Sequence, residues 1–173
     1  MKLFFITILL IFSSGLSAKQ ISLPNSGVSF IAPDEFAPLS KEIMEIKWPS
    51  SRAPAWAIGN SSGSTTIAYD IKPNDISGAP LSEVMDSSEQ LFDRMIPGIE
   101  WKERRILNLA DQEWIFFEMT SNALDTDIYN IMLVSSYGKE MIVFNFNSTK
   151  EDFPKYEKQL RKSIESIKVS KES

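Results

Sequence analysis

The second half of the chain alternates apolar and polar residues with the two-residue period of β-strands. Segments 101–109, 113–121 and 128–137 follow one another, and a fourth begins after Gly138-Lys139, with apolar residues at 142, 144 and 146 on one face. Successive side chains of a strand point to opposite faces, and the connections between these segments are short. The pattern therefore predicts a four-stranded antiparallel meander.

Two segments instead repeat their apolar residues at helical spacing. The first begins after Pro80 and ends at Pro97-Gly98, and we expect its apolar stripe to face the core. That stripe consists of Leu81, Val84, Met85, Leu91, Phe92 and Met95. The pattern therefore predicts an amphipathic helix ahead of the meander.

The second helical segment ends the chain, and Ser148 with Glu151 fits a capping box at its start. Its apolar stripe consists of Phe153, Tyr156, Leu160, Ile164 and Ile167. We expect the opposite, charged side to be solvated. That side carries Lys155, Lys158, Arg161, Lys162 and Glu165.

The first half of the chain is less regular. Residues 27–33 read as a strand stopped by Pro33-Asp34, and an irregular, proline-containing stretch follows. Residues 55–58 and 65–71 read as two strands joined by the Gly- and Ser-rich tract 59–64, which predicts a hairpin.

Residues 1–18 have the pattern of a cleavable secretory signal. Lys2 precedes the apolar run Leu3–Phe12, which as a helix is only about 15 Å long, half of a bilayer core. Small residues then follow up to Ala18, where a signal peptidase cleaves. We therefore expect residues 19–173 to form a single exported domain, periplasmic or secreted, with no membrane segment after cleavage.

Composition removes several classes of function. Without residues 1–18, the chain has 17 basic and 23 acidic residues, a formal net charge of −6. An acidic surface repels phosphate backbones, so nucleic acid is excluded as an expected partner. The sequence contains no cysteine and no histidine, which excludes thiol catalysis, the Ser-His-Asp triad and most zinc sites. We expect no cofactor, no metal and no enzymatic activity.

The order of elements and two sequence runs resemble the PsbP/DcrB-like superfamily over residues 21–169. The runs are Gly27-Val28-Ser29-Phe30 and the ending from Phe144-Asn145-Phe146-Asn147 to Ser166-Ile167-Lys168-Val169. The resemblance implies an α+β fold, an α-β-α sandwich in which an antiparallel sheet has one helix on each face. Members of that superfamily include a photosystem II accessory protein, a nuclear factor acting on the Ran GTPase and periplasmic proteins. It therefore implies an accessory role.

Three short motifs have a plain structural reading. Asp125-Thr126-Asp127, with Glu118, supplies too few oxygens for calcium and reads as a hairpin turn. The run 102–105, Lys-Glu-Arg-Arg, reads as an exposed strand face. Ser61, Ser62 and Ser64 match no nucleophile or phosphate-loop motif.

The stretch 47–56 is the candidate binding segment. It is stiffened by proline and nearly free of acids in an acidic protein, and loops on a rigid sheet often bind partners. Trp48, with Arg52 beside it, is the predicted partner-binding anchor, although Trp48 could instead cap the edge of the core. Trp56 shares a face with Ile58 and is expected to point inward.

The sequence thus favours an exported, non-enzymatic accessory or protein-binding domain, with another protein of the cell envelope as partner. A periplasmic immunity protein, which neutralises a toxin, is an alternative that would suit the acidic charge. A hydrolase that works without histidine is the alternative from a different class.

The signal peptide makes a direct prediction. We expect the mature chain to begin at Ala18 or Lys19, because the small residues end there. Intact-mass measurement of protein from the native host checks this, and a mature form that retains Met1 would contradict it.

Overall fold

The computed structural model describes residues 19–24, 26–48, 53–123 and 126–170, so the predicted signal peptide lies outside it. Its largest element is a seven-stranded sheet in the order β3-β4-β5-β9-β8-β7-β6, antiparallel at every pairing. The strands are β3 (Ala37–Pro38), β4 (Trp56–Gly59), β5 (Thr65–Lys72), β6 (Glu100–Leu109), β7 (Gln112–Asn122), β8 (Asp127–Tyr137) and β9 (Glu140–Thr149). The predicted meander is therefore β6 to β9, and the predicted hairpin is β4–β5.

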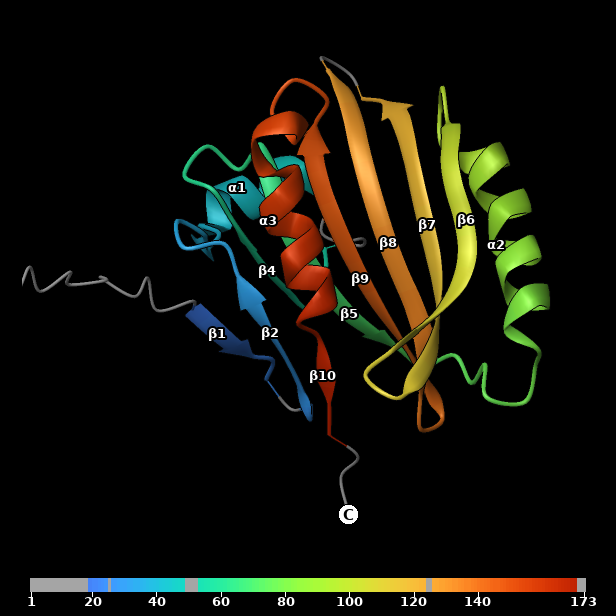
Figure 1. Ribbon diagram of the computed structural model, residues 1–173. Helices are drawn as coiled ribbons and strands as arrows, with labels where there is room; N and C mark the ends of the chain where they lie inside the picture. Colours follow the sequence, from blue (N-terminus) through green and yellow to red (C-terminus); the bar gives the residue numbers. More distant parts are fainter. Residues whose placement is uncertain (1–18, 25, 49–52, 124–125, 171–173) are drawn as a thin grey trace, which may run out of the picture.

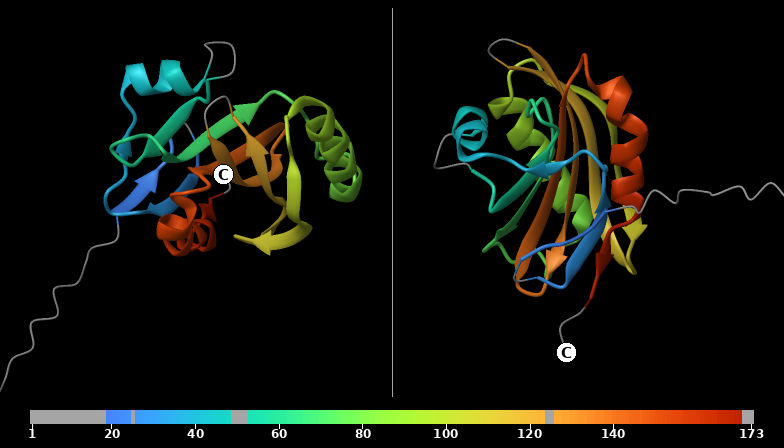
Figure 2. Two further views of the ribbon diagram at one scale, coloured as in Figure 1. Left: turned by 90° about the horizontal axis from the view of Figure 1, so that it is seen from above. Right: turned by 90° about the vertical axis from the view of Figure 1, so that its left-hand side faces the viewer.

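A second, three-stranded sheet has the order β1-β2-β10 and joins the two ends of the described chain. Its strands are β1 (Lys19–Ser22), β2 (Val28–Ala32) and β10 (Lys168–Val169). The helices are α1 (Lys41–Lys47), α2 (Leu81–Met95) and α3 (Phe153–Glu165). Figures 1 and 2 show α3 on one side of the large sheet, with α1 and α2 toward the other.

The larger core lies between the large sheet, α3 and the small sheet. Alternate residues of the central strands face this side, and α3 covers them with its apolar stripe. Among the sheet residues, Trp114, Phe144 and Phe146 are almost fully buried. On α3 and just beyond it, all five residues of the predicted stripe are buried: Phe153, Tyr156, Leu160, Ile164 and Ile167. The helix is therefore fixed by its apolar side, as the periodicity predicts.

The smaller core lies on the opposite face, under α2. Ile115, Phe117, Met119 and Val134 are buried there, and the apolar side of α2 packs on them. The prediction that the whole α2 stripe faces the core is wrong at two positions. The side chains of Leu91 and Met95 are exposed, at 45% and 63%.

The predicted capping box at the start of α3 is also wrong. Ser148 is a buried residue of β9, and its hydroxyl forms a 2.8 Å hydrogen bond with the Thr65 hydroxyl. The helix begins five residues later, after Asp152, whose backbone N–H donates to the Thr149 hydroxyl at 3.2 Å. Pairing of β9 with β5 therefore keeps Ser148 in the strand, although the local sequence favours the start of a helix there.

The predicted fold class is confirmed as α+β with an antiparallel sheet. Four elements have no counterpart in the sequence prediction: β1, β3, α1 and β10. Helix α1 has no buried residue, so its sequence has no apolar stripe from which the helix could be predicted. Because it is a third helix, the finer prediction of one helix on each face remains a proposal.

The contribution of the α3–sheet packing to stability can be measured by substituting Leu160 and Phe144. Each side chain is completely buried, so we expect Leu160→Ala or Phe144→Ala to lower the free energy of unfolding by about 2–5 kcal/mol. Urea unfolding followed by tryptophan fluorescence provides the measurement. Lys158→Ala, on the exposed side of α3, is the control, and a loss under about 1 kcal/mol at both core sites would contradict this packing.

Candidate functional site

Trp48 ends α1 and lies beside a shallow hollow on the face of the sheet opposite α3. The hollow has a volume of 170 Å³ and is lined by the indole together with Pro54 and residues of β5 and β9. Those strand residues are Ala68, Tyr69, Asp70, Lys72, Val143 and Asn145. Trp48 is half-buried and belongs to neither of the two apolar cores. Its indole therefore retains an exposed surface.

Lys47 holds α1 against the sheet next to Trp48. Its Nζ donates to the Gly63 carbonyl oxygen at 2.8 Å and to Asn147 Oδ1 at 3.4 Å, and it lies 5.7 Å from the centre of the Trp48 ring. Burial lowers the pKa of the Lys47 ammonium. Asn147 in turn donates to Asn130 Oδ1 at 2.7 Å, so a polar ladder across β9 and β8 continues from this lysine.

Of the other residues singled out in the predicted binding segment, the structure describes Trp56 but not Arg52. Trp56 points inward as expected: it packs against the larger core, edge to face with Phe30 at 6.2 Å. Arg52 lies outside the described residues. The pairing of Trp48 with Arg52 as a partner-binding anchor therefore stays a prediction.

The acidic motif near residue 126 is not assembled with Glu118. Asp125 lies outside the described residues, and Asp127 is exposed and pairs with Lys150 at 3.6 Å. Glu118 lies on β7 opposite Ile131 of β8, four register positions away from the Asn122–Asp127 pair. Within the described ranges, no three acidic side chains gather as a metal site would require.

The basic run on β6 is neutralised locally. Lys102 pairs with Glu100, Arg104 with Glu89 of α2, and Arg105 with Glu103. These charges lie along the edge strand of the large sheet, where charged side chains discourage pairing with other chains. The reading of an exposed strand face accounts for them.

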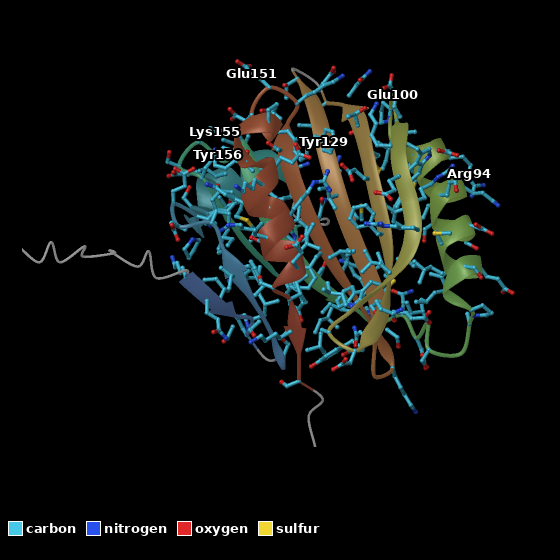
Figure 3. The ribbon with its side chains drawn as sticks, in the orientation of Figure 1. Arg94, Glu100, Tyr129, Glu151, Lys155 and Tyr156 are labelled. Atoms are coloured by element: carbon cyan, nitrogen blue, oxygen red, sulfur yellow. The ribbon has the colours of Figure 1, made fainter. Side chains whose placement is uncertain are left out.

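Ser64 belongs to a polar network that closes the β4–β5 turn onto α3. Its hydroxyl donates to Asp152 Oδ2 at 2.5 Å and accepts from Asn60 Nδ2 at 2.9 Å. Asn60 Nδ2 also reaches the Tyr156 hydroxyl at 3.3 Å, and Lys155 donates to the same hydroxyl at 2.9 Å. Figure 3 shows Lys155 and Tyr156 together at the start of α3. The serine is thus a structural hydrogen-bonding residue of the turn.

Sequence reasoning missed a buried ion pair between β7 and α3. Glu118 is 4% exposed, and the Arg161 guanidinium meets both of its oxygens, at 2.7 and 3.3 Å. The Tyr129 hydroxyl donates to Glu118 Oε1 at 2.5 Å, and its ring stacks on Phe153 with 3.6 Å between centroids. Tyr129 lies beside α3 in Figure 3.

The surroundings favour a charged Arg161 and a neutral Tyr129. The hydrogen bond with Glu118 raises the pKa of Arg161. Burial, followed by the bond to Glu118, raises the pKa of the Tyr129 hydroxyl. The carboxylate thus has charge-assisted partners on two sides, a geometry suited to fixing α3 on the sheet rather than to moving protons.

Comparisons of the fold find solved structures of similar shape, and three of them are described next. PsbP (CyanoP) from Synechocystis sp. PCC 6803 superposes with a TM-score of 0.60 at 11% identity, covering 91% of this chain and 96% of that one. LpqN of Mycobacterium tuberculosis, described as involved in cell envelope biogenesis, gives 0.60 at 13%, covering 91% and 88%. PA94 of Pseudomonas aeruginosa, a putative regulator of unknown function, gives 0.55 at 13%, covering 90% and 99%.

The sequence alone gives no such matches. No protein-family model matches the chain, and no curated protein sequence does either. At these identities the superpositions show a shared fold. They confirm, at that level, the resemblance that the sequence predicts.

The Glu118–Arg161 pair makes a prediction about stability. We expect Glu118→Ala to lower the free energy of unfolding by about 2–4 kcal/mol, because it leaves Arg161 and the Tyr129 hydroxyl without their shared acceptor. The Arg161 side chain is 38% exposed, so water can solvate its charge when the carboxylate is removed. The expected loss of unfolding free energy is therefore smaller than for a fully buried ion pair. Urea unfolding measures the effect.

The matched control is Glu157→Gln, which removes the other carboxylate bound to Arg161. That ion pair is 2.9 Å long but exposed on both sides, so we expect a change below about 0.5 kcal/mol. Equal losses for Glu118→Ala and Glu157→Gln would show that the buried pair does not fix α3.

Proposed function

We propose that this chain, which has the PsbP-like fold, is an exported, non-enzymatic accessory domain that binds another protein of the cell envelope. The fold itself sets no activity, because folds of this kind carry function in their surface sites. The proposal rests on the signal-like residues 1–18 and on the exposed indole of Trp48 above its hollow. LpqN, one of the similar structures, is described as involved in cell envelope biogenesis.

The exposed part of Trp48 is the observation that carries the binding role. Tryptophan is enriched at binding hot spots because it buries a large apolar area while its indole N–H keeps a polar contact. Beside the indole, Asp70, Lys72 and Asn145 add polar side chains to the lining of the hollow. The Lys47 bonds hold α1 in place, so docking at Trp48 orders little additional chain.

The non-enzymatic part of the proposal is supported by how the reactive groups are used. Ser64 donates to a carboxylate and accepts from an amide, and Glu118 is bound by an arginine and a tyrosine. These hydrogen bonds give both side chains a structural role, which supports the proposal that neither of them is a catalytic group. The finer assignment as an α-β-α sandwich with one helix on each face is part of the same proposal.

In the described part of the chain, no helix is both long and apolar enough to cross a membrane. We propose the periplasm, or the medium outside the cell, as the place where the mature chain acts. An immunity role is one form of the same binding function, and it requires the captured partner to be a toxin.

Substitution of Trp48 separates a binding residue from a residue that caps the core. We expect Trp48→Ala to change the free energy of unfolding by less than about 1 kcal/mol, because the indole lies outside both cores, and to abolish partner crosslinking. The measurement places a photo-crosslinking amino acid at position 72 in the native host, in chains with and without Trp48→Ala, because the Lys72 side chain lines the same hollow and is partly exposed. The crosslinked product is then identified by mass spectrometry.

The control places the same crosslinker at Ile106, an exposed apolar residue of β6 at the other edge of the sheet. A specific product from position 72 and not from position 106, lost when Trp48→Ala is added, supports the proposal. If Trp48→Ala melts several degrees lower and position 72 gives no product, Trp48 caps the core and the proposed site is wrong.

A further inference from the structure

A wide groove lies at one end of the large sheet. It has a volume of 980 Å³ and lies between the β6–β7 turn, the β8–β9 turn, residues 76–81 and β10. Ile76, Leu81 and Val169 contribute apolar surface along it. It shares no lining residue with the Trp48 hollow. The volume is at the upper end of the usual range for ligand sites, and the groove is open enough for a chain segment.

Three carboxylates line this groove against one ammonium group. Asp111 and Glu113 come from the β6–β7 hairpin and Glu140 from the β8–β9 hairpin, with Lys139 as the basic residue. All four side chains belong to exposed residues, and among the described residues none of them forms an ion pair. On the neighbouring strand β6, by contrast, the acids are paired with bases. The groove therefore carries a net negative charge that the described chain does not neutralise.

The β6–β7 turn fixes the position of Asp111 at the groove. Ala110 and Asp111 both have positive φ values, 53° and 58°, which non-glycine residues rarely adopt. The flanking Leu109–Gln112 pair makes this a two-residue hairpin turn, whose twist matches that of the strands. The backbone of Asp111 is thus fixed by the hairpin itself.

Among the described strands, β10 is an edge of the three-stranded sheet, and it lies beside these charges. It pairs with β2 through Lys168–Ser29 and Val169–Val28, and the Ser170 N–H continues that ladder to the Gly27 carbonyl oxygen. Alternate residues of an antiparallel strand bond to the same neighbour, so the backbone polar groups of Val169 point away from β2. Val169 lines the groove, and no residue of β2 does.

We infer that this groove binds an extended, basic segment of a partner protein. Lysine or arginine side chains of the segment meet Asp111, Glu113 and Glu140, and its apolar residues contact Ile76, Leu81 and Val169. Extended segments commonly add to a free strand edge in this way. The inference concerns a surface other than Trp48, so it holds or fails independently of the proposed function.

The test uses a short labelled peptide in which lysine and valine alternate, with binding to the mature chain followed by fluorescence anisotropy. We expect D111N/E113Q/E140Q to weaken binding about tenfold or more, because three attractive charges are lost. Asparagine is well tolerated at positive φ, so the turn is expected to fold. Thermal unfolding of the variant verifies this.

The matched control, E35Q/D86N/E151Q, removes one aspartate and two glutamates from exposed positions outside the groove. We expect its affinity to remain within about twofold of the unmodified chain. Equal weakening by both triple variants would mean general attraction to an acidic protein and would overturn the inference. So would equal binding of a peptide in which glutamine replaces lysine, or no binding of the lysine peptide at low salt.

Discussion

The contacts of one side chain, Phe144, hold the layers of this protein together. Its ring meets Phe30 of the small sheet at 5.9 Å, and within the large sheet it meets Tyr69, Trp114 and Phe146 at 5.4 to 6.1 Å. Phe144 is completely buried, and aromatic rings from β2, β5, β7 and β9 itself surround it in the core that α3 covers. Aromatic packing of this kind buries a large area and also fixes orientation. The groove and the Trp48 hollow are built on strands whose relative positions depend on that packing.

How much of the fold the sequence predicts depends on whether tertiary contacts agree with local patterns. The meander and α3 were predictable because one-sided burial imposes a period of two or 3.6 residues. Helix α1 was not, since it buries no residue and is held by Lys47 bonded to Gly63. The capping box failed because the pairing of Ser148 with Thr65, 83 residues away, competes with the local signal and prevails.

The candidate sites show the same division. Trp48 could be predicted as a candidate from the sequence, because proline and tryptophan residues indicate a stiff segment and a binding anchor on their own. The Glu118–Arg161 pair joins residues 43 positions apart, which no short motif encodes. One signal was present: Glu118 shares the inward face of β7 with Trp114 and Phe116, where alternation demands an apolar residue. A carboxylate at such a position indicates a cation partner that reaches it.

The strand order has a consequence for the way the chain is made. Strands β1 to β5 precede β9 in the sequence, yet β5 has β9 as one of its two neighbours. A chain that emerges N-terminus first therefore presents β4–β5 as an unfinished hairpin until residue 149 has followed, while β6 to β9 can pair one after another. Early exposure of an incomplete sheet edge invites aggregation. Delivery of the whole chain before folding, as in export of an unfolded polypeptide, shortens that vulnerable interval.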